Sequence, residues 1–507
     1  MDATGIGEVV KSVRAAFRRG KTLSRESRLC NLGNLLKLVE DHTDDFIEAM
    51  HRDFNKPHLE ARAYEANCVQ SEIVYYMNEL DHFMKTINVN DGSLLLLGKK
   101  TFLKPEPFGV VLIMGAWNYP LQLTLLPLVG AIAAGNCAIV KPSEMNPEFT
   151  LVLTKYFTQY MDQDCFRVVN GEKEASEALL SQRFDHILYT GNPFVGRLVM
   201  NAAAKNLTPV TLELGGKSPV IVDSKSCVSV SARRIVWGKY VNAAQTCIAP
   251  DYILCESSVR DELIDEMKKH LTEFYGSDPK QSQSFGRIIN DRHYERLSKL
   301  LAGKEKYIVH GGDMDRPDRY ISPTFMVDLP LEDPIMQDEI FGPILPIVTV
   351  SSLNDALEFV NAREKPLVLY IFSDDSSFID KAINTTSSGA TVVNDTLIHA
   401  GVDVLPFGGV GSSGMGSFHG SQSFKTFSHM KPCFVDPYYK YLDCTMGVRY
   451  PPYDKKKERV MSLLMKRMTN SEKRVMFMIK LGLLVTMVAV VLKVFAVDEV
   501  VGRIIER

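Results

Sequence analysis

Apolar residues recur three or four positions apart in residues 1–86, and this spacing predicts helices. From Gly109 onward the pattern changes to short β-rich runs separated by helix-length segments. The predicted strands are Val110–Met114, Ala138–Val140, Arg167–Val169, His186–Tyr189 and Val210–Leu214, and the predicted helices between them include Leu121–Ala134 and Pro147–Tyr160. Strands that alternate with helices indicate an α/β fold with a parallel sheet covered on both faces.

The alternation resumes after Leu214 and continues to about Asn394, which predicts a second α/β domain. The segment Ile87–Glu106 has a different pattern. It carries the turn signal Asn90-Asp91-Gly92, followed by the apolar run Leu94–Leu97. We expect a hairpin that is inserted into the α/β layer rather than built from it.

Composition narrows the possible classes of protein. Hydrophobic residues make up 45% of the chain and charged residues 23%, which is typical of a globular protein and excludes a disordered one. The net charge of −3 provides no basic field for nucleic acid. The nine cysteines include no CxxC pair, which indicates a reduced compartment and argues against a disulfide framework or a zinc ribbon.

Polar and glycine-containing motifs stand at the ends of several predicted strands, at the edge where parallel sheets bind ligands, and others come further along the chain. They are Ala116-Trp117-Asn118-Tyr119-Pro120, Lys141-Pro142-Ser143-Glu144, Thr190-Gly191-Asn192 with Gly196, Glu213-Leu214-Gly215-Gly216-Lys217, Ala244-Gln245-Thr246-Cys247-Ile248-Ala249-Pro250, Glu339-Ile340-Phe341-Gly342-Pro343 and Pro406-Phe407-Gly408-Gly409. In this order the series resembles the aldehyde dehydrogenase superfamily from about Val9 to Lys431. The residues within these motifs are most similar to those of the fatty aldehyde dehydrogenases of the class 3 branch.

The resemblance implies a set of catalytic residues that makes chemical sense. An aldehyde becomes a hydride donor once a thiolate adds to its carbonyl carbon, and Cys247 is the implied nucleophile. Asn118 and the backbone N–H of Cys247 would stabilise the tetrahedral oxygen. Glu213 would activate the water that hydrolyses the resulting acyl thioester, and Glu339 is a second candidate for proton handling.

The resemblance also implies a nicotinamide cofactor. Lys141 and Glu144 stand where the family holds the adenosine ribose, and Glu144 would repel a 2′-phosphate, which favours NAD over NADP. The strand-to-helix turn at 191–196 suits a pyrophosphate. The implied cofactor contacts are Lys141, Glu144, Gly191, Asn192, Gly196, Glu339 and Phe341, the implied aldehyde channel includes Tyr119 and Phe407, and no metal is implied.

The domain organisation follows from the same resemblance. Residues 1–86 and 107–213 would form a Rossmann-like NAD-binding domain, and 214–394 the α/β catalytic domain. Residues 87–106 and 395–440 would form a small bridging β-sheet that extends the partner's sheet in a homodimer.

The C-terminal segment 475–497 is almost wholly apolar and contains Lys480 and Lys493. As a helix its 23 residues would span about 34 Å, enough to cross a bilayer, with both lysines near the interfaces. The preceding segment 441–474 has a net charge of +5, which attracts an anionic leaflet. We expect a transmembrane tail anchor with the catalytic domain in the cytosol, and the resemblance implies the endoplasmic reticulum. The alternative is a solvated terminal helix that docks on its own domain.

Two further alternatives concern the activity. The chain would be a non-catalytic scaffold if it had kept only the fold, but intact Asn118, Glu213, Cys247 and Glu339 argue against this. Acyl transfer to coenzyme A instead of water is disfavoured by the presence of Glu213 as a hydrolytic base. The sequence therefore predicts an NAD-dependent dehydrogenase acting on medium- to long-chain aliphatic aldehydes.

Overall fold

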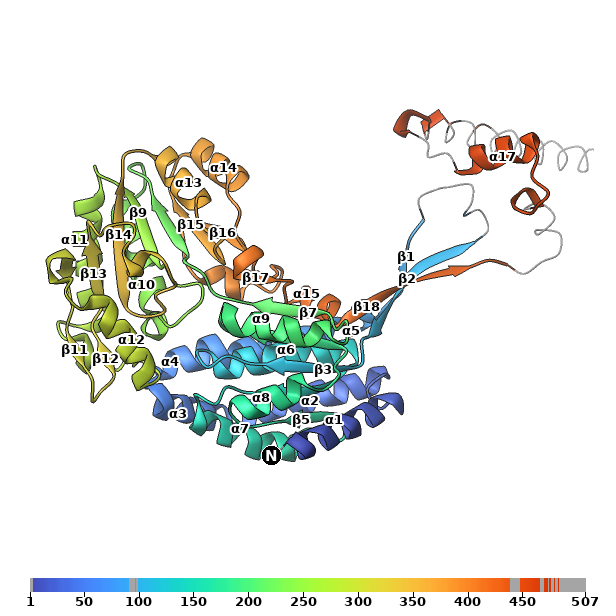
Figure 1. Cartoon of the computed structure of the whole chain (residues 1–507), viewed down its shortest axis with the longest axis horizontal. Helices are drawn as coiled ribbons and strands as arrows, with labels where there is room; N and C mark the ends of the chain where they lie inside the picture. Colours follow the sequence, from blue (N-terminus) through green and yellow to red (C-terminus); the bar gives the residue numbers. More distant parts are fainter. Residues whose placement is uncertain are drawn as a thin grey trace, which may run out of the picture. The chain divides into compact units, whose positions relative to one another are not determined.

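The computed structural model describes residues 3–90, 96, 99–437 and 447–465, with a few isolated positions between 469 and 482. The chain forms two compact units (Figure 1). The first comprises residues 1–85 and 105–430, and the second comprises residues 86–104 and 431–507.

The first unit begins with helices, as the apolar spacing predicts. The buried positions of the first helix include Ile6, Val10 and Val13. These helices are α1 (Ala3–Arg18), α2 (Arg25–Asp41), α3 (Thr43–Phe54), α4 (His58–Ala61) and α5 (Asn67–Met84), with a π-helical turn η1 (Arg62–Ala66) between the last two.

A six-stranded sheet follows, in the order β17-β7-β6-β3-β4-β5. Its strands are β3 (Val110–Met114), β4 (Cys137–Lys141), β5 (Phe166–Val168), β6 (His186–Thr190), β7 (Val210–Glu213) and β17 (Gly414–Met415). All neighbours are parallel except β17, which pairs antiparallel with β7. Every residue of β3, β4 and β6 is buried, which explains why these strands are continuous apolar runs.

The order of strands in this sheet reverses after β5. Because parallel crossovers are right-handed, the reversal places α6 (Pro120–Ala134) and α7 (Pro147–Tyr160) on one face. It places α8 (Lys173–Leu180) and α9 (Pro193–Ala204) on the other. The reversal leaves a crevice beyond the carboxyl ends of β3 and β6, the usual ligand position in such sheets.

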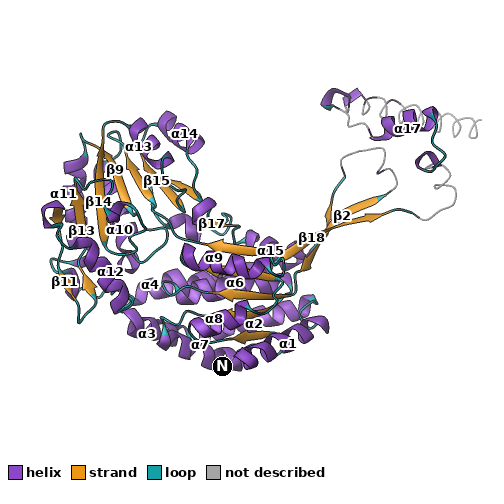
Figure 2. Cartoon of the chain, viewed as in Figure 1, coloured by secondary structure: helices purple, strands orange, loops and turns teal. Residues whose placement is uncertain are grey.

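A seven-stranded sheet, in the order β10-β13-β14-β9-β8-β15-β16, forms the second half of this unit (Figure 2). All its pairs are parallel except β10 with β13. The strands are β8 (Pro219–Val222), β9 (Tyr252–Glu256), β10 (Ile308–His310), β13 (Thr324–Val327), β14 (Ile344–Val350), β15 (Val368–Phe372) and β16 (Ala390–Val393), and β11 (Met314–Asp315) pairs separately with β12 (Tyr320–Ile321). Its helices are α10 (Val228–Tyr240), α11 (Arg260–Tyr275), α12 (Asp291–Leu301), α13 (Leu353–Asn361) and α14 (Ser376–Thr385). The two sheets confirm the predicted α/β fold class.

The segment expected to act as a bridging element, 395–440, is divided between different structures. Its short strand β17 completes the six-stranded sheet, and α15 (Ser421–Thr426) packs on α6 of the same unit. Only β18 (Ser428–Val435) joins a three-stranded sheet with β1 (Ile87–Asn88) and β2 (Lys100–Pro107). The division has a physical reason, since β17 satisfies the backbone groups along the edge of β7.

In the second unit β1 and β2 pair antiparallel, with Ile87 opposite Leu103, as a hairpin requires. Of the predicted turn Asn90-Asp91-Gly92, residues 91 and 92 lie outside the described residues. The unit also contains α17 (Lys455–Met465). Within the described part of the chain, no helix is long and apolar enough to cross a membrane. The predicted span 475–497 lies almost entirely outside that part.

Candidate active site

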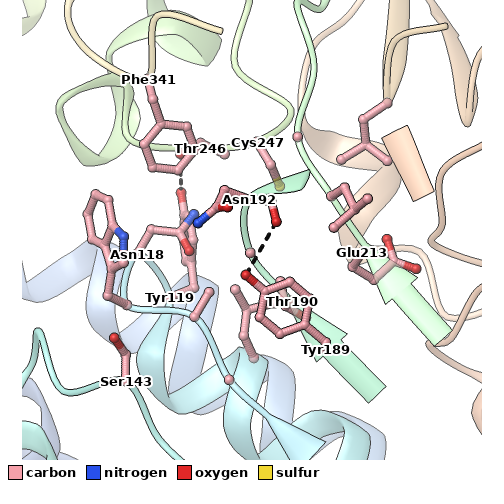
Figure 3. Close-up of a pocket in the computed structure, with 18 of the residues that line it drawn as sticks. Asn118, Tyr119, Ser143, Tyr189, Thr190, Asn192, Glu213, Thr246, Cys247 and Phe341 are labelled. Atoms are coloured by element: carbon pink, nitrogen blue, oxygen red, sulfur yellow. Dashed lines mark hydrogen bonds between the residues drawn. The ribbon is translucent and has the colours of Figure 1, made fainter. Parts of the chain in front are cut away.

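A cavity of about 1200 Å³ in the first unit is lined by loops from both sheets. The lining residues include all but one of the predicted site residues, namely Asn118, Tyr119, Lys141, Glu144, Gly191, Asn192, Glu213, Cys247, Glu339, Phe341 and Phe407. Figure 3 shows Asn118, Cys247 and Glu213 around this common space. The structure therefore brings together side chains that are up to 289 residues apart, from Asn118 to Phe407.

Gly196 is the predicted site residue that does not line the cavity. It lies inside α9, where its N–H donates to the carbonyl of Asn192. A Cβ at this position would come within 2.9 Å of Leu214, so the glycine allows close helix–strand packing. Gly196 thus supports the turn at 191–196 from inside α9 and does not contact the cavity.

Cys247 lies in the loop between α10 and β9, and its side chain is half-buried. The loop is reached through three consecutive residues in the left-handed region, Asn242 (φ 56°), Ala243 (φ 51°) and Ala244 (φ 63°). Glycine adopts this region without steric cost, whereas all three of these residues carry a Cβ, so the run is strained. Burial, and then the nearby carboxylates of Glu339 and Glu213, raise the pKa of the Cys247 thiol. The thiol form is therefore favoured until a base removes its proton.

Asn118 follows β3 and is buried. Its Nδ2 donates to the carbonyl of Gln245, 3.0 Å away, which ties the side chain to the loop of Cys247. An amide nitrogen carries two hydrogens, so one N–H remains for an oxygen in the cavity. The next residue, Tyr119, also joins the loops, since its hydroxyl lies 2.9 Å from that of Thr246.

Glu213 ends β7, and its side chain is 2% exposed. Neither of its carboxyl oxygens has a hydrogen-bond partner among the described residues. Desolvation raises the pKa of Glu213 well above its ordinary value. A buried carboxyl group that lacks a fixed partner can act as a general base once it has ionised.

Glu339 is the second carboxyl group of the cavity. Burial and the Asp251 carboxylate raise the pKa of Glu339 to about 8, while a hydrogen bond from the Gly216 N–H opposes the shift. A Cβ at Gly215 would clash with the Glu339 carboxyl group, so this glycine is needed for the approach. Lys217 anchors the same loop by donating to the carbonyls of Ile335 (2.7 Å) and Asp338 (3.0 Å).

The carboxyl ends of β3, β4 and β6 present the groups expected for a dinucleotide. Lys141 is 4% exposed, and its Nζ lies 3.2 Å from Glu144, so an ammonium donor and a carboxylate acceptor stand side by side. Asn192 caps α9 by accepting from the N–H of Val195, and a Cβ at Gly191 would collide with the Tyr189 hydroxyl. This close backbone approach, beside a helix N-terminus, fits a nicotinamide dinucleotide.

The opposite wall is aromatic and apolar, which suits an aliphatic chain. Phe407 packs edge-on against Phe418, with ring centroids 6.0 Å apart. Residues that sequence reasoning did not single out complete this wall, namely Tyr64, Cys68, Trp237, Leu397 and His419. No motif marks them, because they come from η1, α5, α10 and loops far apart in the sequence.

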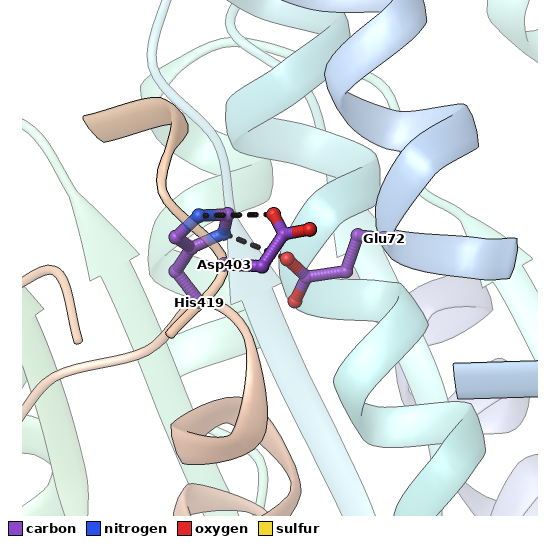
Figure 4. Close-up of side chains that lie close together, drawn as sticks. All are labelled: Glu72, Asp403 and His419. Carbon is purple, nitrogen blue, oxygen red and sulfur yellow. Dashed lines mark ion pairs between the residues drawn. The ribbon is translucent and has the colours of Figure 1, made fainter. Parts of the chain in front are cut away.

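His419 is held between two carboxylates in the cavity wall (Figure 4). Its Nδ1 lies 2.7 Å from Glu72 and its Nε2 lies 3.7 Å from Asp403. Although burial opposes it, the hydrogen bond that the ring donates to Glu72 and the negative charges of Glu72 and Asp403 raise the pKa of His419. Glu72 also accepts from the Gly420 N–H and the Ser423 hydroxyl. The two ring nitrogens face different carboxylates, so the three side chains form an ion triad.

Comparisons with known proteins agree with this geometry. The aldehyde dehydrogenase family pattern matches residues 1–433. The chain is 47% identical to aldehyde dehydrogenase family 3 member A2 of Rattus norvegicus over 448 residues, covering 88% of this chain and 92% of that protein. It is 45% identical to the dimeric NADP-preferring aldehyde dehydrogenase of Canis lupus familiaris, covering 88% and 98%.

A solved structure shows the same fold at high similarity. The substrate-bound state of Staphylococcus aureus AldH matches with a TM-score of 0.87 and 42% identity, covering 90% of this chain and 98% of that one. The resemblance found in the sequence is thereby confirmed. The chain belongs to the aldehyde dehydrogenase family, in its class 3 branch, and is an enzyme that uses NAD or NADP.

Proposed function

We propose that this enzyme oxidises medium- to long-chain aliphatic aldehydes to carboxylic acids with NAD, through a covalent intermediate on Cys247. The observation that carries the proposal is the composition of one cavity. A thiol, a free amide N–H and a carboxyl group without a fixed partner face it, and part of its wall is aromatic and apolar.

The first step requires the thiolate of Cys247 to attack the carbonyl carbon. Because burial favours the thiol, its proton must pass to a base in the same cavity. Glu213 and Glu339 both have raised pKa values, so either carboxylate is basic enough to accept it. The free N–H of Asn118 and the backbone N–H of Cys247 then stabilise the tetrahedral oxygen.

The cofactor, when bound at the carboxyl ends of β3, β4 and β6, supplies the hydride acceptor. Loss of hydride leaves an acyl thioester on Cys247. Glu213 takes a proton from water, the water oxygen adds to the thioester carbon, and the carboxylic acid leaves as the sulfur regains its proton.

The preference for NAD rests on Glu144, which stands beside Lys141 where an adenosine ribose would bind. Its negative charge accepts a hydrogen bond from a free 2′-hydroxyl and repels a 2′-phosphate. One relative is named NADP-preferring, so the assay must compare both cofactors directly.

The test measures reduced cofactor produced by the purified protein with NAD or NADP and saturated aldehydes of rising chain length. The proposal expects kcat/KM to rise from short to medium and long chains and to be higher with NAD. A preference for short or aromatic aldehydes would contradict the substrate assignment, and a preference for NADP would contradict the cofactor assignment.

We also propose a homodimer and attachment to the endoplasmic reticulum membrane through residues 475–497, with the catalytic domain in the cytosol. The dimer is supported by the name of the Canis lupus familiaris relative and by β18, an edge strand of its sheet among the described residues. An unpaired edge can add a strand from a second copy. The attachment is supported by the apolar run and the basic segment that precedes it.

A further inference from the structure

Three ionisable residues that no motif marks form a buried cluster behind the active site. Lys56 lies between α3 and α4, Glu60 lies on α4, and Glu65 lies on the π-helical turn η1. The side chains of Lys56 and Glu65 are fully buried and form an ion pair. Glu60 is 8% exposed. We refer to Lys56, Glu60 and Glu65 as the buried charge cluster.

The ion pair holds the loop that carries Asn118. The Lys56 Nζ donates to the backbone carbonyl of Asn118 at 3.0 Å and lies 3.8 Å from the centre of the Tyr119 ring. Glu65 accepts from the N–H groups of Leu121 (2.8 Å) and Gln122 (3.3 Å), at the start of α6. The two charges therefore fix the backbone at Asn118 and immediately after it.

Glu60 holds the approach to Cys247. Its carboxylate accepts from the N–H of Asn242 at 2.8 Å, the first of the three left-handed residues. The Asn242 side chain in turn donates to the carbonyls of Asn118 (2.9 Å) and Gln245 (3.1 Å). A left-handed run without glycine persists only where its surroundings enforce it.

Stability alone does not explain this arrangement. Burying an ion pair removes both charges from water, and apolar side chains of the same size stabilise a core as well or better. Charged groups also form directional hydrogen bonds, and each member of the cluster donates to or accepts from particular backbone atoms. Here every such atom belongs to the Asn118 loop, the start of α6 or the Cys247 approach. A π-helical turn, which is frequent at functional sites, carries one of the charges.

We propose that Lys56, Glu60 and Glu65 are positioning residues that fix the amide of Asn118 relative to the thiol of Cys247. The inference rests on the proposed roles of Asn118 and Cys247. None of the three residues lines the cavity, so the cluster acts on the tetrahedral step through Asn118 and leaves cofactor affinity unchanged.

The test is a double-mutant cycle in the full-length protein. Lys56→Met removes the donor to the Asn118 carbonyl, and Asn118→Ala removes the amide itself. A small misplacement of a reacting group costs on the order of tenfold to a hundredfold in rate. We expect Lys56→Met to lower kcat by this factor with the KM for NAD unchanged. In the Asn118→Ala background, the same substitution should have little further effect.

A matched control breaks another ion pair of the same unit. Arg14 pairs with Asp185 at 2.6 Å, at the amino ends of β3 and β6, away from the cavity. Arg14→Met should leave kcat within twofold of wild type. Glu65→Gln provides a second, near-isosteric variant if Lys56→Met does not fold. One amide oxygen cannot accept from both Lys56 and the start of α6, so this variant should show the same kcat loss and the same dependence on Asn118.

The outcomes separate the inference from the proposed function. Near-normal kcat in folded Lys56→Met or Glu65→Gln would overturn the positioning role, as would a full kcat loss that persists in the Asn118→Ala background. Full activity of Asn118→Ala would overturn the oxyanion assignment, and the positioning role with it.

Discussion

Cys247 and Glu213 lie where burial favours the neutral form of each side chain. The thiol must lose a proton before it attacks, and the carboxyl group must lose one before it can act as a base. A proton that leaves Cys247 can pass to Glu213 only after that carboxyl group has itself ionised. The chemistry of each residue therefore depends on the other.

The first prediction concerns the nucleophile. Cys247→Ser should abolish dehydrogenase turnover, because a serine hydroxyl is a far weaker nucleophile than a thiolate. NAD binding should remain close to wild type, since the proposed contacts at Lys141, Glu144 and Gly191 are unchanged. Reduced cofactor production and calorimetric NAD titration provide the two measurements. Near-normal turnover, or an acyl group trapped on another cysteine, would refute the assignment.

The second prediction separates acylation from hydrolysis. Glu213→Gln should slow thioester hydrolysis, so that one equivalent of NADH appears rapidly before slow turnover. Because the pKa of Glu213 is raised, wild-type hydrolysis should accelerate with rising pH as the carboxylate forms, and the variant should lose this dependence. Stopped-flow measurement of NADH at several pH values checks both effects. Full activity in Glu213→Gln would transfer the base role to Glu339.

At the scale of elements, the strands and their crossovers can be predicted from the sequence. The residues that hold the site in place, such as Lys56 and Glu65, cannot. The predicted run Val110–Met114 and helix Pro147–Tyr160 match β3 and α7 residue for residue. A parallel strand covered on both faces must be a continuous apolar run, and such a run is visible without knowledge of its partners. Lys56 and Glu65 instead look like ordinary polar residues of a helical stretch, because their burial depends on contacts far away in the sequence.

Some residues of the cavity could likewise be predicted from the sequence, and others could not. Asn118 and Glu213 stand in motifs at strand ends, and Cys247 stands in the motif of the loop before β9, so the resemblance identifies them. Ala244 belongs to the same motif as Cys247, but only the structure shows its left-handed conformation. His419 belongs to no motif and is placed by α5 and the loop of Asp403.

The third prediction concerns the tie between α5 and the segment before α15. His419→Gln removes the charge between Glu72 and Asp403 and should lower the free energy of unfolding by about 2 kcal/mol. A histidine whose folded pKa is raised contributes its full stability below the unfolded value of 6.5 and loses it as pH rises through the folded pKa. The difference between variant and wild type should therefore shrink at alkaline pH. Urea unfolding across this range checks the effect.

His82→Gln is the matched control for this prediction. His82 is exposed and lies on α5 as well, so its substitution should change stability little at any pH. A constant difference between His419→Gln and wild type, independent of pH, would show that the His419 charge is not what ties the elements together.

At the scale of the whole molecule, the active site depends on both sheets of the first unit. The six-stranded sheet supplies Asn118 and Glu213, and the loops of the seven-stranded sheet supply Cys247 and Glu339. Neither half contains a complete reaction centre. The long sequence separation of these residues is thus a property of the architecture and not of any single motif.

The fourth prediction concerns the C-terminal segment. A variant that ends at Lys473 should lose membrane pelleting and keep its activity on short, water-soluble aldehydes, because the cavity lies within residues 64–419. Its activity on long-chain aldehydes presented in vesicles should fall much more, since such substrates partition into bilayers. Sedimentation with vesicles and parallel assays check this. Release of the full-length protein by high salt or alkaline wash would show that residues 475–497 are not inserted and that the basic segment alone attaches it.

The two-residue strand β17 affects how the protein folds during its synthesis on the ribosome. It closes the edge of β7, the strand that ends in Glu213, but it lies about 200 residues later in the chain. At a synthesis rate of roughly 5–20 residues per second, about 10–40 seconds pass between the synthesis of β7 and that of β17. During this interval the backbone N–H and C=O groups on this edge of β7 are unpaired and can bind another strand. A chain that terminates before Gly414 would leave them permanently unpaired.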